Sequence, residues 1–347
     1  MSDHDHNHDH AHERLRGLRG LLAGVFSPHS HDANDSVDSA LTASAEGMRA
    51  LKISLIGLAV TALFQVVVVA VSGSVALLAD TIHNASDALT AIPLAVAFWL
   101  GRRRPTKRYT YGYGRAEDLA GIFIVAMIAL SAAVAGWEAV RRLLDPQDVE
   151  NVGWVMAAGV IGFVGNELVA VYRIRVGRKI GSAALVADGL HARTDGFTSL
   201  AVVAGAVGVA VGFPLADPIV GLVITAAILV VLKGAARDIY RRLMDSVDPD
   251  LVDEVFAVVA SVAGVVAVES VQIRWVGHEL RAEIEISSRA DLLLTEAHTI
   301  AEEAHHRLLH DIPRLTRATI HMSPHADGRD DHHAVTAHHF DPGAAAS

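Results

Sequence analysis

Two short segments of the sequence carry the same arrangement of ionisable residues within apolar surroundings. Residues 79–87 read ADTIHNASD and residues 187–195 read ADGLHARTD, so both follow the pattern Ala-Asp-x-x-His-x-x-x-Asp. On a helix, residues four positions apart lie on one face, so each His lies beside the Asp that follows it. The repeat therefore predicts two helices that each present an imidazole and a carboxylate on one face.

If these two helices pack side by side, four nitrogen and oxygen ligands converge. The predicted ligands are His83, Asp87, His191 and Asp195. Such a set suits Zn²⁺, which binds His nitrogen and Asp oxygen at about 2.0–2.2 Å in tetrahedral geometry. A charge at the centre of a bilayer costs about 2.5–3.5 kcal/mol, and a bound cation or protons would neutralise it. The alternative is a polar contact between helices without metal, but the repeated spacing favours metal binding.

Asp80 and Asp188 lie about one turn before the two histidines. We interpret them as residues that orient the ligands or relay protons, because metal ligands commonly hold hydrogen-bonded outer partners. Solvation of a helix end is the alternative for both. Asn84, Asn166 and Glu167 are further polar residues in apolar runs, and for these we expect hydrogen bonds between helices.

The elements that would position these residues are apolar runs long enough to cross a bilayer, which takes about 20 residues. Six such runs occur, at residues 51–72, 75–100, 117–142, 152–175, 183–211 and 216–236. Lys and Arg concentrate in the connections RRRPTKR, RIRVGRKI and RDIYRR. The positive-inside rule then places these connections and both termini in the cytoplasm of a multi-pass cell-membrane protein. Arg141 and Arg142 are exceptions to this rule, next to acidic residues.

The sequence changes character from about residue 248. Residues 250–263 and 295–310 have helical patterns, and residues 266–276, 280–288 and 315–322 have strand patterns. The fold class predicted is thus a membrane all-α six-helix bundle with a C-terminal cytoplasmic α+β domain of αββαβ order. The predicted divisions are a His-rich tail 1–49, a membrane domain 50–247, a cytoplasmic domain 248–323 and a disordered His-rich tail 324–347.

Composition narrows the function. Hydrophobic residues make up 52% of the chain and the net charge is −10, which argues against a nucleic-acid partner. Cys is absent, so any metal ligands are nitrogen and oxygen atoms. No HExxH motif occurs, which argues against an intramembrane metalloprotease. A membrane metal sensor that signals through its cytoplasmic domain is the alternative to a transporter.

Four segments, LLADTIHNASD, YGYGRAEDLAG, ALVADGLHARTD and ADPIVGLVI, resemble the cation diffusion facilitator family. The resemblance implies a homodimeric secondary transporter that exports divalent metal cations in exchange for protons. It also implies a metallochaperone-like cytoplasmic domain and a transport site at the four ligands named above. The two histidines resemble the zinc-type members, while Cd²⁺, Co²⁺ and Fe²⁺ stay open as substrates.

The resemblance also implies secondary sites. Arg115 and Asp245 match a salt bridge between the second connection and the end of the sixth run. Cytoplasmic metal ligands would fall on Glu285, His298 and His321, with His278 as a possible addition. Surface residues without metal are the alternative for each of these.

Other positions depart from the family pattern or stand outside it. Glu269 stands where another member has His, and Tyr109 and Tyr113 stand where some members bind a second metal, so we expect no metal at the tyrosines. The N-terminal histidines could hold Zn²⁺ loosely or form a solubilising tail; they are His4, His6, His8, His10 and His12.

Overall fold

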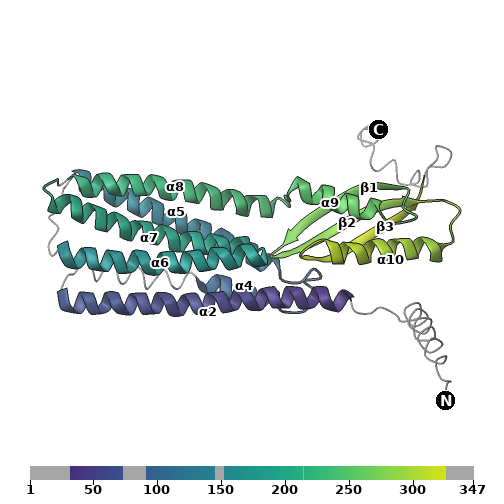
Figure 1. Ribbon diagram of the computed structural model, residues 1–347, viewed down its shortest axis with the longest axis horizontal. Helices are drawn as coiled ribbons and strands as arrows, with labels where there is room; N and C mark the ends of the chain where they lie inside the picture. The colour runs from purple at the N-terminus through teal and green to yellow at the C-terminus, as the bar shows by residue number, and fades with distance from the viewer. Residues whose placement is uncertain (1–31, 73–90, 145–151, 214, 326–347) are drawn as a thin grey trace, which may run out of the picture.

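The computed structural model describes residues 32–72, 91–144, 152–213 and 215–325. A bundle of long helices occupies one end of the molecule and a small domain of strands and helices occupies the other (Figure 1). Three sequence predictions lie outside the described residues. These are most of the second apolar run, with Asp80, His83, Asn84 and Asp87, the N-terminal histidines, and the tail after residue 325.

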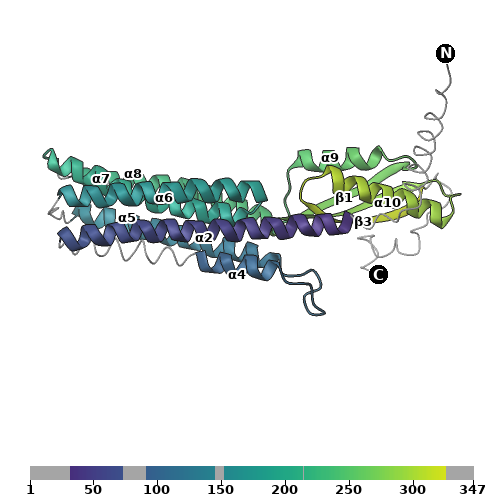
Figure 2. The same cartoon turned by 60° about the horizontal axis from the view of Figure 1, so that its bottom comes forward.

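The bundle contains α2 (Asp32–Ser72), α4 (Ala91–Gly101), α5 (Arg115–Leu144), α6 (Val152–Ile180), α7 (Ala183–Ala210) and α8 (Ala216–Leu243). Among the residues that the structure describes, four segments are long and apolar enough to cross a membrane, namely Thr42–Val68, Arg115–Leu144, Val152–Ile180 and Ala216–Leu243. Helix α7 is also 28 residues long and packs on α5, α6 and α8, but Asp188, Arg193 and Asp195 interrupt its apolar sequence. Helix α4, which lies beside α2 (Figure 2), is the described end of the second predicted run. The predicted count of six spanning helices therefore stays a prediction.

Two helices extend past their predicted apolar runs because polar contacts hold the extra turns. Helix α2 begins at Asp32, before the run predicted from residue 51. Its Glu46 forms an ion pair with Lys179 of α6 at 2.8 Å. Helix α8 continues to Leu243, beyond the predicted end at residue 236, and its Arg242 donates to backbone carbonyls of other segments. A hydropathy pattern does not detect these turns because charged side chains stabilise them.

The small domain consists of α9 (Pro249–Ala260), β1 (Ala267–Val276), β2 (Glu279–Ser288), α10 (Leu294–Asp311) and β3 (Leu315–Pro324). The predicted αββαβ order is confirmed. Strand β2 lies between β1, to which it is antiparallel, and β3, to which it is parallel. Helix α10 supplies the crossover that a parallel pair needs.

One face of this sheet carries the core of the domain. In β2, Ala282, Ile284 and Ile286 are buried whereas Glu283 and Glu285 between them are exposed. The buried residues pack with Val259 of α9, Leu308 of α10 and their apolar neighbours. Both helices therefore cover the same face, and the opposite face is open and polar.

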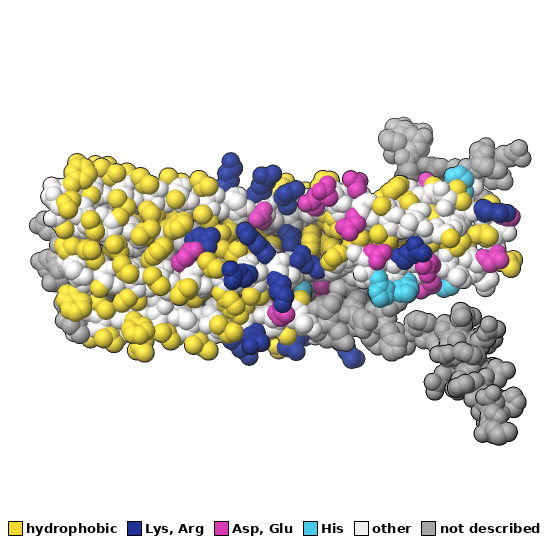
Figure 3. Space-filling model, viewed as in Figure 1, with side chains coloured by type: hydrophobic (Ala, Val, Ile, Leu, Met, Phe, Trp, Pro, Cys, Tyr) yellow, Lys and Arg dark blue, Asp and Glu magenta, His cyan; other side chains and the backbone are white. Residues whose placement is uncertain are grey.

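The surface divides in the way expected of a membrane protein. Large hydrophobic side chains are exposed around the bundle, as in Ile56, Trp137 and Leu168. On the face shown in Figure 3, Lys and Arg side chains gather where the bundle meets the small domain, and acidic side chains lie mostly from there onward over the small domain. Exposed apolar surface of this extent is stable in lipid and not in water.

Candidate functional site

Half of the predicted metal-binding set lies on α7. The side chains of His191 and Asp195 are 2% and 6% exposed, and the Nδ1 and Oδ1 atoms are 3.8 Å apart. Two ligands that are each about 2.1 Å from a tetrahedral ion lie roughly 3.4 Å apart, so a small shift would let both bind one ion. The pair is thus buried, adjacent and close to the spacing of two ligands.

The backbone around this pair is fixed locally. Ser182 precedes α7 and its hydroxyl accepts a hydrogen bond from the Leu185 amide at 3.0 Å, which satisfies a free donor of the first turn. Thr194 donates to the His191 carbonyl at 2.7 Å, and Thr198 donates to the Asp195 carbonyl at 2.7 Å. Both threonine hydroxyls therefore donate to backbone carbonyls of α7 and not to the His191 or Asp195 side chains.

The partner half of the set is not placed. His83 and Asp87 lie outside the described residues, as does Asp80. Within the described ranges, no three His, Asp or Glu side chains gather as a group able to hold a metal.

Asp188 has a cationic partner that the sequence analysis did not identify. Its carboxylate lies 2.9 Å from the Nη1 atom of Arg173 on α6, and the two side chains are 0% and 2% exposed. The Nε and Nη2 atoms of Arg173 have no hydrogen-bond partner among the described residues. Arg173 appears in the sequence as the first residue of a basic connection. Its position at the end of an apolar run is the feature that could have marked it as buried.

Glu167 of α6 joins two helices by hydrogen bonds, as expected. Glu167 accepts two hydrogen bonds from Arg193 of α7, at 2.7 and 3.1 Å, in the two-pronged geometry typical of Arg and a carboxylate. Asn166 is buried on α6, where it faces Gly196 of α7.

The expected pair Arg115–Asp245 is present at the junction of the two domains. The guanidinium of Arg115 lies 2.6 Å from Asp245 and 3.3 Å from Asp118. Nearby, Arg242 stacks on Trp275 at 3.9 Å. The junction therefore joins the end of α8 to the start of α5 and to β1.

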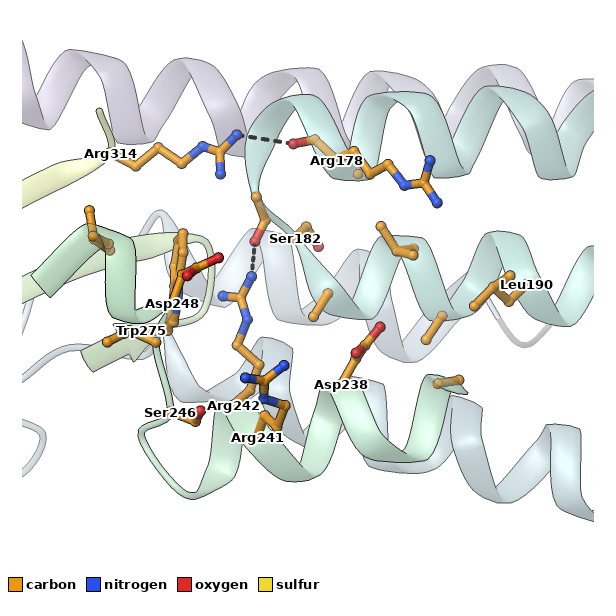
Figure 4. A pocket seen from close by; sticks show the side chains of 18 residues that line it. Arg178, Ser182, Leu190, Asp238, Arg241, Arg242, Ser246, Asp248, Trp275 and Arg314 are labelled. Carbon is orange, nitrogen blue, oxygen red and sulfur yellow. Dashed lines mark hydrogen bonds between the residues drawn. The ribbon is translucent and has the colours of Figure 1, made fainter. Parts of the chain in front are cut away.

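Arg242 also lies in a cavity of about 450 Å³ between the helix ends and the small domain (Figure 4). Its guanidinium donates to the Gly181 carbonyl at 2.7 Å, and that of Arg314 donates to the Arg178 carbonyl at 3.0 Å. Four arginines line the cavity against two aspartates; the six residues are Arg178, Arg241, Arg242, Arg314, Asp238 and Asp248. The excess of positive charge makes this cavity unsuitable for a divalent cation.

His278 has a different place from the one considered for it. It lies in the β1–β2 turn with its side chain 8% exposed, and its Nδ1 atom is 2.8 Å from Glu117 of α5. Its Nε2 atom is 3.3 Å from the Ser44 hydroxyl of α2. The possible grouping of His278 with the cytoplasmic metal ligands is therefore wrong, because the turn inserts between helix ends of the bundle. Glu117, within the YGYGRAEDLAG segment, is a junction residue that the sequence analysis missed.

The three residues predicted as cytoplasmic metal ligands do not meet within one chain. Glu285 and His321 are partners in the β2–β3 register and lie on the open face of the sheet. His298 is exposed on α10, which packs on the opposite face. Glu269, also considered there, accepts a hydrogen bond from Ser287 at 2.8 Å.

Comparison with known proteins places both domains in one family. Residues 51–244 match the cation efflux transmembrane domain, and residues 247–325 match the cation efflux protein cytoplasmic domain. A probable cation efflux system protein of Mycobacterium tuberculosis is 60% identical over 94% of this chain and 96% of its own length.

More distant relatives carry other names. The manganese efflux system protein MneP of Bacillus subtilis is 25% identical over 74% of this chain and 88% of its own length. The magnetosome protein MamB of Paramagnetospirillum magneticum is 25% identical over 76% of this chain and 89% of its own length. The matches cover both the helical bundle and the small domain. A membrane domain agrees with the bundle of apolar helices, and a separate cytoplasmic domain agrees with the αββαβ order of the small domain. The chain belongs to the cation efflux family, whose members are membrane transporters of metal cations and not enzymes.

Proposed function

We propose that this protein exports Zn²⁺ from the cytoplasm in exchange for protons. The observation that carries the proposal is the buried pair His191–Asp195, whose ring nitrogen and carboxylate oxygen lie 3.8 Å apart within the bundle. The proposed site consists of His83, Asp87, His191 and Asp195. A metal and protons compete for the same imidazole and carboxylate atoms, so proton binding from outside would release the ion.

The choice of zinc rests on the nitrogen ligands. Imidazole suits Zn²⁺, whereas Mn²⁺ prefers sites made largely of oxygen atoms. The manganese efflux relative shares only 25% of its residues with this chain over the matched length. Cd²⁺, Co²⁺ and Fe²⁺ also bind mixed nitrogen and oxygen sites, and we place them after Zn²⁺ as substrates.

We also propose a homodimer of six-helix protomers with both termini in the cytoplasm. The cytoplasmic-domain match and the open polar face of its sheet support an interface between two copies. A metal site that used Glu285, His298 and His321 would have to draw ligands from both copies, because one chain keeps His298 apart from the other two.

The test is Zn²⁺ flux into proteoliposomes that carry a pH gradient. We expect the wild type to transport Zn²⁺ only with the gradient, and we expect Asp195→Asn to reduce the rate to background. Asp253→Asn, an exposed carboxylate of α9, is the matched control and should transport as the wild type does. Transport by Asp195→Asn at the wild-type rate would remove Asp195 from the site. A preference for Mn²⁺ over Zn²⁺ in the same assay would refute the choice of metal.

A further inference from the structure

A cavity runs from the candidate site toward the end of the bundle away from the cytoplasmic domain. It has a volume of about 530 Å³ and is lined by α5, α7 and α8. Asp195 lines it at one end, Thr198 and Ser131 follow, and Glu138, Arg142 and Asp217 line the other end. The C-terminal turns of α5 and the first turn of α8 form this far end (Figure 1).

An ion-pair cluster joins the helices at the far end. The Nη1 atom of Arg142 on α5 lies 3.0 Å from a carboxylate oxygen of Asp217 on α8. Its Nε atom lies 2.9 Å from Glu138, one turn earlier on α5. One guanidinium therefore links two carboxylates from two different helices.

The third helix approaches the same cluster closely. Gly205 of α7 lies against Asp217, and a Cβ atom added at Gly205 would collide with the backbone and carboxylate of Asp217. The glycine thus lets the first turn of α8 sit directly on α7, ten residues beyond Asp195 on the same helix. A change in the α5–α8 contact acts directly on the helix that carries half of the candidate site.

The charges of the cluster explain an exception in the sequence. Arg142 lies at the end of the bundle where the positive-inside rule disfavours arginine. Two carboxylates compensate it, and Arg141 lies 3.9 Å from one of them, Glu138, so two arginines balance two carboxylates beside the cavity. Separation of Arg142 from Asp217 would leave the Asp217 carboxylate free to face a departing cation, while Glu138 stays paired with Arg142.

We propose that the Arg142–Asp217 ion pair is an extracytoplasmic gate that closes this cavity and separates when the ion leaves. That metal leaves through this gate rests on the proposed export function. That the ion pair closes the cavity does not depend on that function. Glu138 holds the Arg142 guanidinium on α5 when the pair opens, so that Asp217 moves with α8.

The first experiment measures access to the cavity without any transport. The chain contains no Cys, so Thr198→Cys provides a single thiol in the cavity. We expect slow reaction with a membrane-impermeant maleimide added outside intact cells, and a roughly fivefold faster reaction when Arg142→Gln is added, from the loss of one partly exposed ion pair. Arg307→Gln, which breaks an ion pair on α10, is the matched control and should leave the rate unchanged. Equal rates with and without Arg142→Gln would overturn the gate.

The second experiment asks whether opening is needed for export. Arg142→Cys with Asp217→Cys would be joined by a bifunctional thiosulfonate reagent of about the length of an arginine side chain. We expect the joined protein to bind Zn²⁺ as before but to lose flux, with recovery after reduction. Undiminished flux in the joined protein would refute the gate. A wild type that moves no divalent cation would refute the proposed export function instead. In that case the labelling rates alone would decide whether the ion pair closes the cavity.

Discussion

The buried pair Arg173–Asp188 allows the sharpest test of the packing of this bundle. Both side chains are almost fully enclosed and their charged atoms lie 2.9 Å apart. Removal of one partner leaves an uncompensated buried charge, which costs about 3–5 kcal/mol of unfolding free energy. Asp188→Asn and Arg173→Met should therefore each destabilise the protein by about that amount. The double variant Arg173→Met with Asp188→Leu should regain most of the loss, because apolar side chains often replace a buried ion pair without cost.

The measurement is equilibrium unfolding in mild detergent by titration with a denaturing detergent. Trp154 on α6 supplies a fluorescence signal in the same helix as Arg173. Arg307→Met with Glu303→Leu, which replaces an ion pair of about half-exposed residues, is the control and should change the free energy by under about 1 kcal/mol. A loss below about 1 kcal/mol for Asp188→Asn, or a double variant no more stable than Arg173→Met alone, would refute the reasoning.

The same set of variants separates two roles of Asp188. If Asp188 only positions α7, the double variant should be both stable and active in Zn²⁺ transport. If it relays protons, as the sequence suggests, the double variant should be stable but should lose proton-driven flux. The unfolding and flux measurements together therefore assign the role.

Three further predictions concern the junction. Gly277→Ala should lower stability by about 1–2 kcal/mol, because residue 277 has a φ of 64° that only glycine adopts freely; an unchanged thermal midpoint would show that the turn adapts. His278→Ala should cost about 1–3 kcal/mol by leaving the buried Glu117 carboxylate without its imidazole, and Glu117→Gln added to it should return part of this loss. Arg115→Gln should cost under about 1 kcal/mol and should make the thermal midpoint less sensitive to salt, because the pair with Asp245 is about 40% exposed; a loss of several kcal/mol would mean that this pair holds the domains together.

The order of elements could be predicted where local pattern decides it. The alternation of Ile284 and Ile286 with Glu283 and Glu285 fixes both the strand and its buried face, and the strand ends agree with prediction to within two residues. Long apolar runs likewise marked the helices of the bundle. Helix ends were missed where charged residues such as Glu46 and Arg242 extend a helix through contacts distant in the sequence.

The candidate site was predictable only in part. The repeat identified His191 and Asp195 because helical spacing alone puts them on one face. The partner of Asp188 was not predictable, since nothing in the sequence shows that Arg173 turns inward toward α7. His278 was misassigned for the same reason, because its neighbours Glu117 and Ser44 are more than 150 positions away in the chain.

The contacts of Arg242 have a mechanical consequence. One guanidinium binds the Gly277 carbonyl of the β1–β2 turn and the Gly181 carbonyl just before α7. From the start of α7 at Ala183 to His191 is eight residues, or about 12 Å of rigid helix. A rotation of the cytoplasmic domain would thus be transmitted through Arg242 to the proposed metal ligands on α7. Because such coupling is reciprocal, metal bound at the proposed site of His191 and Asp195 should bias the position of the cytoplasmic domain as strongly as that domain biases the metal affinity of the site.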